Sequence, residues 1–184
     1  MENSIKKSKK LAPSKKVFLI ASAIVLLLIF AIVYAFSAPY SAPSQFVENQ
    51  TVTSEETMFF TYEISRYPTK VEISNITEKN ISIGFSLEPW NLNFGIVPTG
   101  GSMGNRFINL ENTADRASKI KLVAYGNIAD MVTFSDNDFL ISKNAPKPVK
   151  ITLETKKDTP LGNYSGEIDI IVKKPKYDFA GKLL

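Results

Sequence analysis

The residue types that most often carry enzyme chemistry are largely missing from this sequence of 184 residues. It contains no histidine and no cysteine. That absence excludes Ser–His–Asp and Cys–His catalysis and ordinary zinc sites. Two carboxylate pairs remain, Asp136 with Asp138 and Glu167 with Asp169, and a carboxylate pair is the residue set that glycoside hydrolysis uses. Glu167 and Asp169 lie two positions apart in an alternating run, so we expect both on the solvent face of one strand.

Two further segments have part of the pattern of a binding loop. Residues 135–138 are rich in oxygen ligands for calcium, but they lack the glycine and the distal glutamate of an EF-hand. Residues 100–104 are glycine-rich, yet neither a Lys-Ser/Thr ending nor a helix follows them, as a phosphate-binding loop requires. We interpret these segments as a turn and a hairpin connection. The sequence therefore predicts a protein that is not an enzyme and uses no metal or cofactor.

The longest apolar run covers residues 17–36 and contains no charged residue. Twenty helical residues span about 30 Å, which is the hydrocarbon thickness of a bilayer, and inside lipid a helix pairs its own backbone groups. We therefore predict a transmembrane helix at 17–36. The alternative is a cleaved signal peptide with Ala35-Phe36-Ser37 at its cleavage site, but the apolar core of a signal peptide is shorter, at about 7–15 residues.

The positive charge of the chain is concentrated before this apolar run. Residues 1–16 contain six lysines and one glutamate, whereas 16 basic and 17 acidic residues follow residue 36. Lysines beside a first apolar helix favour a cytoplasmic location for that end and attract anionic lipid headgroups. We expect a cytoplasmic basic tail at 1–16, a single pass through the cell membrane, an extracytoplasmic C-terminal domain and no nucleic-acid partner.

Beyond the apolar run, the sequence pattern predicts β-structure. Residues 37–45 are a Pro/Ser-rich stalk, typical of an extended spacer. Short alternating runs then recur between Gly, Pro, Asn and Asp residues. One-sided apolar strands predict sheets with one buried and one wet face, and two such sheets bury their apolar faces on each other. We predict an all-β antiparallel sandwich over 46–173, followed by a loose tail at 174–184. The eight expected strands cover residues 57–64, 70–73, 80–87, 92–97, 106–111, 118–125, 149–154 and 164–172.

Three motifs resemble those of known sandwich domains. The sequence LNFGIVPTGG at 92–101 is similar to the L-x-F-G-x-V-x-x-G opening of ASH-type immunoglobulin-like domains, and RFINLENT at 106–113 is similar to their R-x-I-x-L-x-N-T strand. The segments 149–153 and 158–166 resemble the closing part of alpha-galactosidase-associated domains. A short anchor before such a domain also resembles uncharacterised single-pass surface proteins of archaea. The resemblance covers less than half of the chain and implies an immunoglobulin-like spacer, adaptor or protein-binding module, since fold alone does not define function.

Four residues in these motifs have structural explanations. We expect Phe94 to pack in the domain, and Gly95 and Gly162 to suit turns or close backbone approach. Tyr164 opens the last long strand. Its hydroxyl is expected to bond a nearby backbone group, as in a tyrosine corner.

The remaining candidate sites belong to the surface. Trp90, the single tryptophan, lies between two expected strands and is a candidate partner contact. In the strand at 57–64, alternation puts Phe60 and Tyr62 on one face and Phe59 on the other. Candidate glycosylation sites with the sequence Asn-x-Ser/Thr begin at Asn49, Asn75, Asn80 and Asn163.

These observations predict a non-enzymatic, membrane-anchored surface protein. Its domain would act as a structural or protein-interaction module in the cell envelope, and its partner would be another envelope protein or a second copy. The alternative is a carbohydrate-binding module, favoured by Trp90 and the resemblance to glycosidase-associated domains. A carboxylate-dependent hydrolase would instead need a deep acidic cleft.

Overall fold

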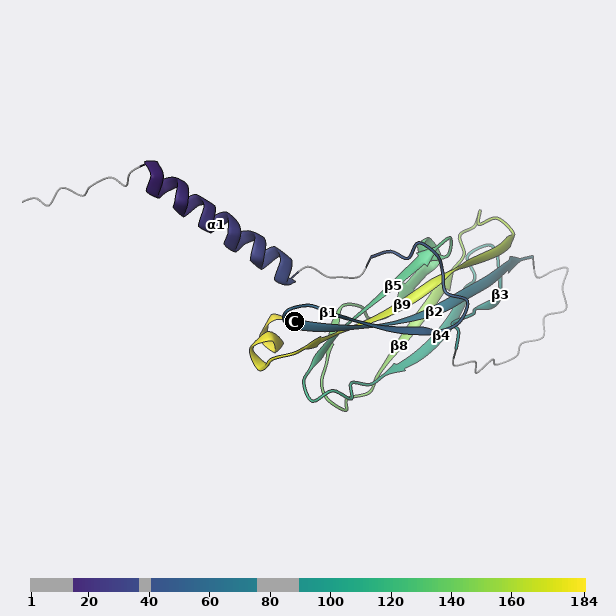
Figure 1. Ribbon diagram of the computed structural model, residues 1–184. Coiled ribbons are helices and arrows are strands. Elements are labelled where there is room, and N and C mark those ends of the chain that lie inside the picture. The colour runs from purple at the N-terminus through teal and green to yellow at the C-terminus, as the bar shows by residue number, and fades with distance from the viewer. Residues whose placement is uncertain (1–14, 37–40, 76–89) are drawn as a thin grey trace, which may run out of the picture. The chain divides into compact units, whose positions relative to one another are not determined.

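The computed structural model describes residues 15–36, 41–75 and 90–184, which fall into a helical unit and a β unit (Figure 1). The helical unit contains α1, Lys15–Phe36. Its stretch Val17–Tyr34 is long and apolar enough to cross a membrane, although a signal sequence would meet the same criteria. The predicted apolar helix is confirmed, whereas its insertion and orientation stay predictions.

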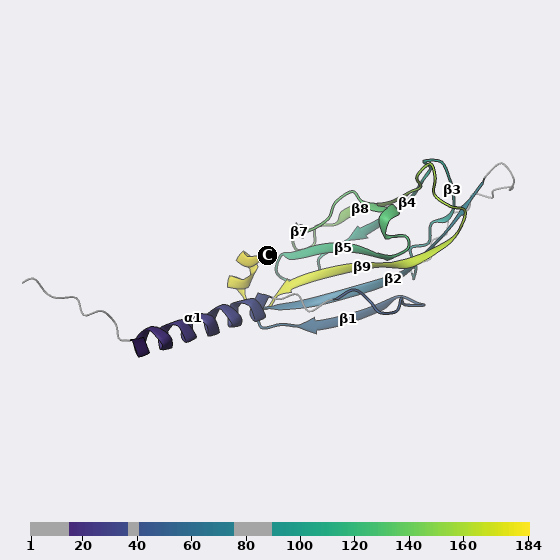
Figure 2. The same ribbon diagram turned by 90° about the horizontal axis from the view of Figure 1, so that it is seen from above.

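Nine strands of the described residues form two sheets that pack face to face (Figure 2). The larger sheet has the order β1-β2-β9-β5-β7, with β3 also beside β2, and the smaller has the order β4-β8-β6. Every strand pair is antiparallel except β2 with β3. The predicted all-β sandwich after an N-terminal helix is confirmed. The strands are β1 Thr51–Glu56, β2 Phe60–Ser74, β3 Gly95–Pro98, β4 Met103–Leu110, β5 Ser118–Gly126, β6 Val132–Phe134, β7 Phe139–Ile141, β8 Lys147–Glu154 and β9 Gly162–Pro175; two 3-10 helices are η2 Ala129–Met131 and η3 Asp178–Leu183.

The inner core lies between the sheets and follows the predicted alternation. In β8, Val149, Ile151 and Leu153 are fully buried, and in β5, Ile120 and Leu122 are buried. Because these strands present every second side chain to the same face, the alternation of apolar and polar residues gives each sheet a continuous row of apolar side chains.

Strand β2 is longer than expected because it has two successive partners along one edge. The expected strands at 57–64 and 70–73 merge into it, while residues 57–59 form the turn from β1. β1 pairs with the first part of β2; further along, Leu92 N–H donates to the Pro68 carbonyl at 3.1 Å and Phe94 N–H to the Lys70 carbonyl at 2.9 Å. Pro68 lies where one partner ends and the next begins, so its missing N–H removes no ladder bond. The expected strand at 80–87 lies outside the described residues.

The outer face of the larger sheet is not wet, which contradicts our expectation. A second apolar cluster buries Phe60, Tyr62, Ile64 and Ile171 on that face, together with Ala180 of η3. The physical reason is visible in the sequence of β9, because three consecutive apolar residues, Ile170, Ile171 and Val172, put apolar side chains on both faces of one strand.

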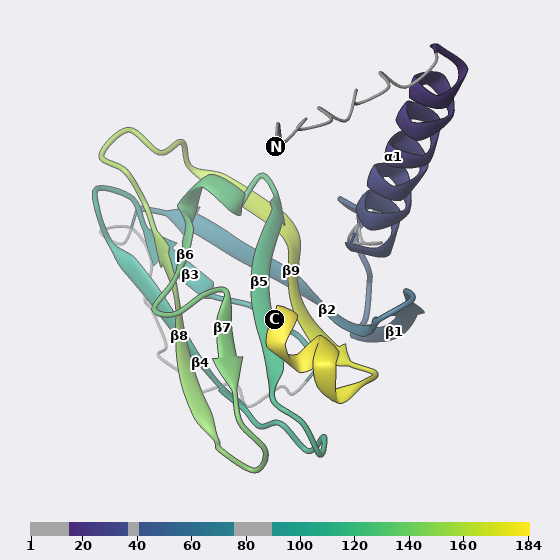
Figure 3. The ribbon, with the colours of Figure 1, turned by 90° about the vertical axis from the view of Figure 1, so that its left-hand side faces the viewer.

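The tail expected to be loose packs on this cluster (Figure 3). β9 continues to Pro175, and Lys176 N–H donates to the Phe59 carbonyl at 2.9 Å. The ring of Phe179 meets that of Phe59 edge to face, with centroids 5.6 Å apart. The loose-tail prediction is therefore wrong, since the apolar residues of the tail cover a face that would otherwise expose large side chains.

β9 and β5 approach each other closely at Gly166. A methyl carbon added there would lie 2.0 Å from the carbonyl oxygen of Tyr125 and 2.6 Å from Ile128 Cγ1. We expect Gly166→Ala to lower the free energy of unfolding by about 1–3 kcal/mol, measured by urea denaturation. Gly181→Ala is the control, because its nearest atom would be Pro175 Cγ at 3.9 Å. Equal stability of the two variants would contradict this prediction.

Candidate functional site

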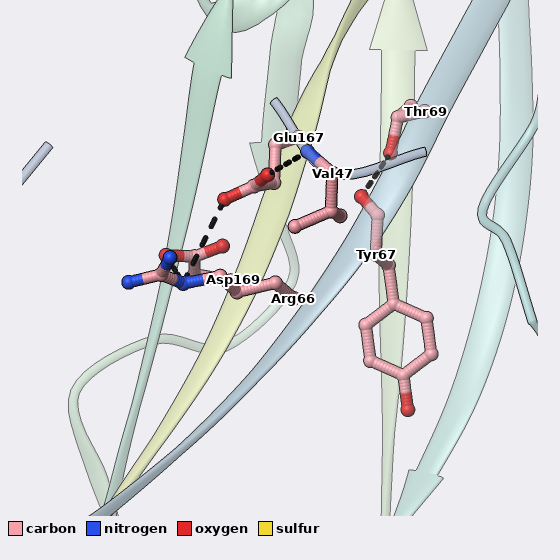
Figure 4. Close-up of polar contacts among 6 residues, drawn as sticks. All are labelled: Val47, Arg66, Tyr67, Thr69, Glu167 and Asp169. Atoms are coloured by element: carbon pink, nitrogen blue, oxygen red, sulfur yellow. Dashed lines mark hydrogen bonds and ion pairs between the residues drawn. The ribbon is translucent and has the colours of Figure 1, made fainter. Parts of the chain in front are cut away.

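Figure 4 shows a buried polar cluster. It lies on the same outer face of the larger sheet as the apolar cluster, because Arg66 and Asp169 lie two positions along their strands from Ile64 and Ile171. Arg66 of β2 lies beside Asp169 of β9, with its Nε 3.9 Å from Asp169 Oδ2 and 3.9 Å from Glu167 Oε1. The backbone N–H of Val47 donates to Glu167 Oε2 at 2.8 Å. The segment that precedes β1 thus covers the carboxylates, and Glu167 and Asp169 are 0% and 2% exposed.

The prediction that Glu167 and Asp169 share a solvent face is wrong, although they do share a face. Alternation correctly predicted that both lie on the side opposite Ile168, but the local pattern did not reveal that Val47 and Arg66 contact the carboxylates on that side. Among the described residues, Arg66 Nε, Glu167 Oε1 and Asp169 Oδ1 are buried without a hydrogen-bond partner. The cluster therefore has polar groups whose interactions are incompletely satisfied.

Burial and the second carboxyl group shift the protonation of this pair. Desolvation, together with the hydrogen bond and the negative charge of Glu167, raises the pKa of Asp169 to about 7, although Arg66 opposes the shift. A carboxyl group that titrates near neutral pH is a feature of catalytic acids. Here, however, the group lies beneath a covering segment, and neither carboxylate lines the hollow described below.

The raised pKa of Asp169 predicts a dependence of stability on pH. Its ordinary value is near 3.8 and its folded value is about 7, so the folded state binds this proton more strongly. The stabilisation is complete below about pH 4 and is lost as the pH rises through about 7. We expect the urea midpoint to fall between pH 5 and pH 8, and Asp169→Asn to reduce that fall. A midpoint that behaves identically in both proteins would contradict this assignment.

The other carboxylate pair is bound to lysines on the surface. Asp136 lies 3.0 Å from Lys147 Nζ, and Asp138, which has a φ of 54°, lies 3.1 Å from Lys119 Nζ. No group of three or more His, Cys, Asp or Glu residues in the described part of the chain is placed to hold a metal ion. The geometry agrees with our interpretation of this segment as a turn.

The four motif residues have structural positions. The hydroxyl of Tyr164 donates to the Pro160 carbonyl at 2.9 Å, which confirms the predicted bond to a nearby backbone group. Gly95 and Gly162 have φ values of 69° and 148°, in the region that favours glycine. Phe94 is half-buried against the inner core.

The candidate glycosylation sites and Trp90 lie on the surface where they are described. Asn49, Asn75 and Asn163 are exposed, whereas Asn80 lies outside the described residues. Trp90 is 66% exposed. A surface hollow of about 560 Å³ at the ends of β2, β3 and β9 is lined by residues including Lys70, Glu72, Asn93, Ile96 and Asn163, but not by Trp90. Trp90 and this hollow therefore do not form one binding site.

Strand β4 forms one edge of the smaller sheet. β8 is its only partner strand among the described residues. Just before β4, Thr155 N–H donates to the Ser102 carbonyl at 2.9 Å, so these two residues form a hydrogen-bonded pair. In an antiparallel ladder such pairs recur at every second residue. The backbone groups that point away from β8 are therefore those of Met103, Asn105, Phe107 and Asn109.

The side chains on this edge leave it open to a further strand. Phe107 is 72% and Met103 60% exposed, and the outward row of β4 contains no charged residue. Natural edge strands are usually protected by charges, proline, bulges or a covering segment. By contrast, β1 at the edge of the larger sheet carries Glu55 and Glu56. Sequence reasoning predicted a strand at 106–111, but it did not identify this strand as an edge.

No family model and no curated protein matches this chain. Among solved structures, the DraE adhesin in complex with chloramphenicol succinate is similar over 67% of this chain and 97% of that chain, with 12% sequence identity and a TM-score of 0.34. Similarity at this level does not bear on binding or activity. The resemblance to ASH-type and alpha-galactosidase-associated domains stays a prediction.

Proposed function

We propose that this chain is a non-enzymatic, single-pass membrane protein that displays its sandwich in the cell envelope as a protein-interaction module. The observation that carries this proposal is the edge of β4 that faces away from β8: no described residue pairs with it, and its outward row is uncharged and exposes Phe107 and Met103. The apolar helix α1 and the basic residues before it support the anchor and its orientation.

The edge of β4 provides a physical mechanism of recognition. An extended segment placed beside it would pair with the outward backbone groups of the strand, and those hydrogen bonds supply affinity. Phe107 and Met103 would pack against alternate side chains of that segment and supply selectivity. A binding site of this kind needs no catalytic residue, in agreement with the absence of histidine and cysteine.

The anchor and its orientation can be tested by cysteine labelling, because the chain has no cysteine of its own. Leu161 is 60% exposed in the β unit. We expect a membrane-impermeant maleimide to label Leu161→Cys in intact cells, and to label Ser8→Cys only after permeabilisation. Recovery of the protein in the soluble fraction, or labelling of Ser8→Cys in intact cells, would contradict the proposed topology.

The second candidate function is carbohydrate binding at the cell surface, favoured by the exposure of Trp90. Aromatic rings of this kind stack on the apolar faces of sugars. If this function holds, a glycan array will show binding that Trp90→Ala abolishes and Phe107→Ala preserves. Absence of any Trp90-dependent signal would remove this candidate.

A further inference from the structure

We infer that the strand that completes β4 is β4 of a second copy of this chain, paired antiparallel about a two-fold axis at Asn105. This inference rests on the proposed function, because it names the partner of the same edge. The two small sheets would then form one continuous six-stranded sheet, with β4 of each copy at its centre. Two-fold pairing of this kind is closed, so it produces a dimer and leaves no open β4 edge.

The outward side of β4 is complementary to itself in this register. A two-fold axis at Asn105 places Met103 opposite Phe107 of the second copy, and the same pair forms again on the other side of the axis. The two asparagines meet at the centre. Thioether–aromatic contacts are favourable, and directly opposite side chains of this kind stabilise a sheet. The backbone N–H and C=O groups of Met103, Asn105 and Phe107 point away from β8, toward the second copy. The residue pairs that would exchange hydrogen bonds are therefore the same pairs whose side chains lie opposite each other.

The inward side of β4 supports the same register. With the axis at Asn105, Arg106 lies opposite the uncharged Gly104 of the second copy, whose side-chain position is filled by Val97 and Phe94 of its own subunit. Arg106 is held in its own subunit, with its Nε 2.5 Å from the Asn93 carbonyl oxygen. Moving the axis by one residue would place Arg106 opposite itself, and like charges directly opposite each other are destabilising. A further shift would put Met103 opposite Glu111.

Charge does not oppose pairing with a second copy. The outward row Met103, Asn105, Phe107 and Asn109 carries no charge, so two identical edges meet without repulsion. If both chains are anchored in one membrane, confinement raises their effective concentration and favours pairing through a small interface.

Single-cysteine cross-linking of the full chain in native membranes tests both the partner and the register. A short bifunctional thiol reagent is expected to convert Asn105→Cys to a covalent dimer as its main product. Phe107→Cys alone should give none, because its own counterpart is four residues away along the paired strand, a distance of about 13 Å. Co-expressed Met103→Cys and Phe107→Cys chains should cross-link to each other. Thr133→Cys, exposed on β6 at the other edge of the same sheet, is the control and should stay monomeric.

The alternative outcomes separate this inference from the proposed function. A dimer from Phe107→Cys alone, without one from Asn105→Cys, would overturn the register. An adduct between Asn105→Cys and a different protein would overturn the second copy as partner but leave the interaction module standing. If neither Asn105→Cys nor the mixed pair gives any product, while both unfold at the wild-type urea midpoint, the inference and the proposed role of β4 both fail.

Discussion

Replacing Arg66 with Met is expected to lower the free energy of unfolding by about 3–5 kcal/mol, as typically found when one partner of a buried ion pair is removed. Arg66 is the cation beside the carboxylates of Glu167 and Asp169, each at 3.9 Å, and both carboxylates are buried. Without it, at least one negative charge stays buried with no opposite charge nearby. Urea denaturation at pH 8, where Asp169 is mostly ionised, measures the effect.

Two comparisons make this result specific to the carboxylates. Lys70→Met changes a cation on the same strand and face that is exposed, so its effect should stay within about 0.5 kcal/mol. Adding Glu167→Gln and Asp169→Asn to Arg66→Met should recover part of the lost stability, because the uncompensated charges are gone. If Arg66→Met is as stable as Lys70→Met, the cluster does not require its cation.

Phe60→Ala is the second change with a large expected effect, at about 3–5 kcal/mol of destabilisation. Phe60 is 0% exposed on the outer face of the larger sheet. Its ring meets that of Tyr62 at 6.4 Å between centroids, and Lys173 Nζ lies 3.8 Å from its centre. Truncation would leave a cavity beneath η3, which can collapse only partly. The urea midpoint of the isolated domain, residues 41–184, reports the loss.

Phe179→Ala is the matched control, because Phe179 belongs to the same tail contact but is 53% exposed. We expect it to cost less than about 1 kcal/mol. Similar, small effects at both positions would mean that the outer face is not a second core and that the tail contributes little to stability.

The elements predicted well from sequence are those with one buried and one exposed side. Residues 118–125 and 149–154 alternate cleanly, and both form strands with the expected faces. The bond from Tyr164 was also predictable, since it is made within four residues of sequence. In each case the side chain contacts either a residue close in sequence or the apolar face of the opposite sheet.

Features that depend on distant segments were not predictable in the same way. The cover over Glu167 comes from Val47, 120 residues away, and nothing near Glu167 signals its presence. The run Ile170-Ile171-Val172 did carry a signal for burial on both faces. The short strands β6 and β7 contain three residues each, too few for a periodic pattern.

The candidate interaction site on β4 also combines features that were predictable from local sequence with one that depends on a distant segment. Sequence reasoning identified the strand that contains Phe107 and singled out Trp90, yet the exposed edge of β4 follows from its pairing with β8, about forty residues further along the chain. Strand order in a sheet is set by such long-range pairing and not by the local alternation. The edge was therefore accessible only through the structure.

Site-specific photo-cross-linking in intact cells tests whether the edge of β4 is the interaction surface. A benzophenone amino acid at position 107 would probe the edge of β4, and the same group at Leu140 would serve as control, because Leu140 is 58% exposed on β7 of the other sheet. We expect a discrete cross-linked product from position 107 and none from position 140. Products from position 140 alone, or from neither position, would contradict the assignment of the β4 edge as the interaction surface.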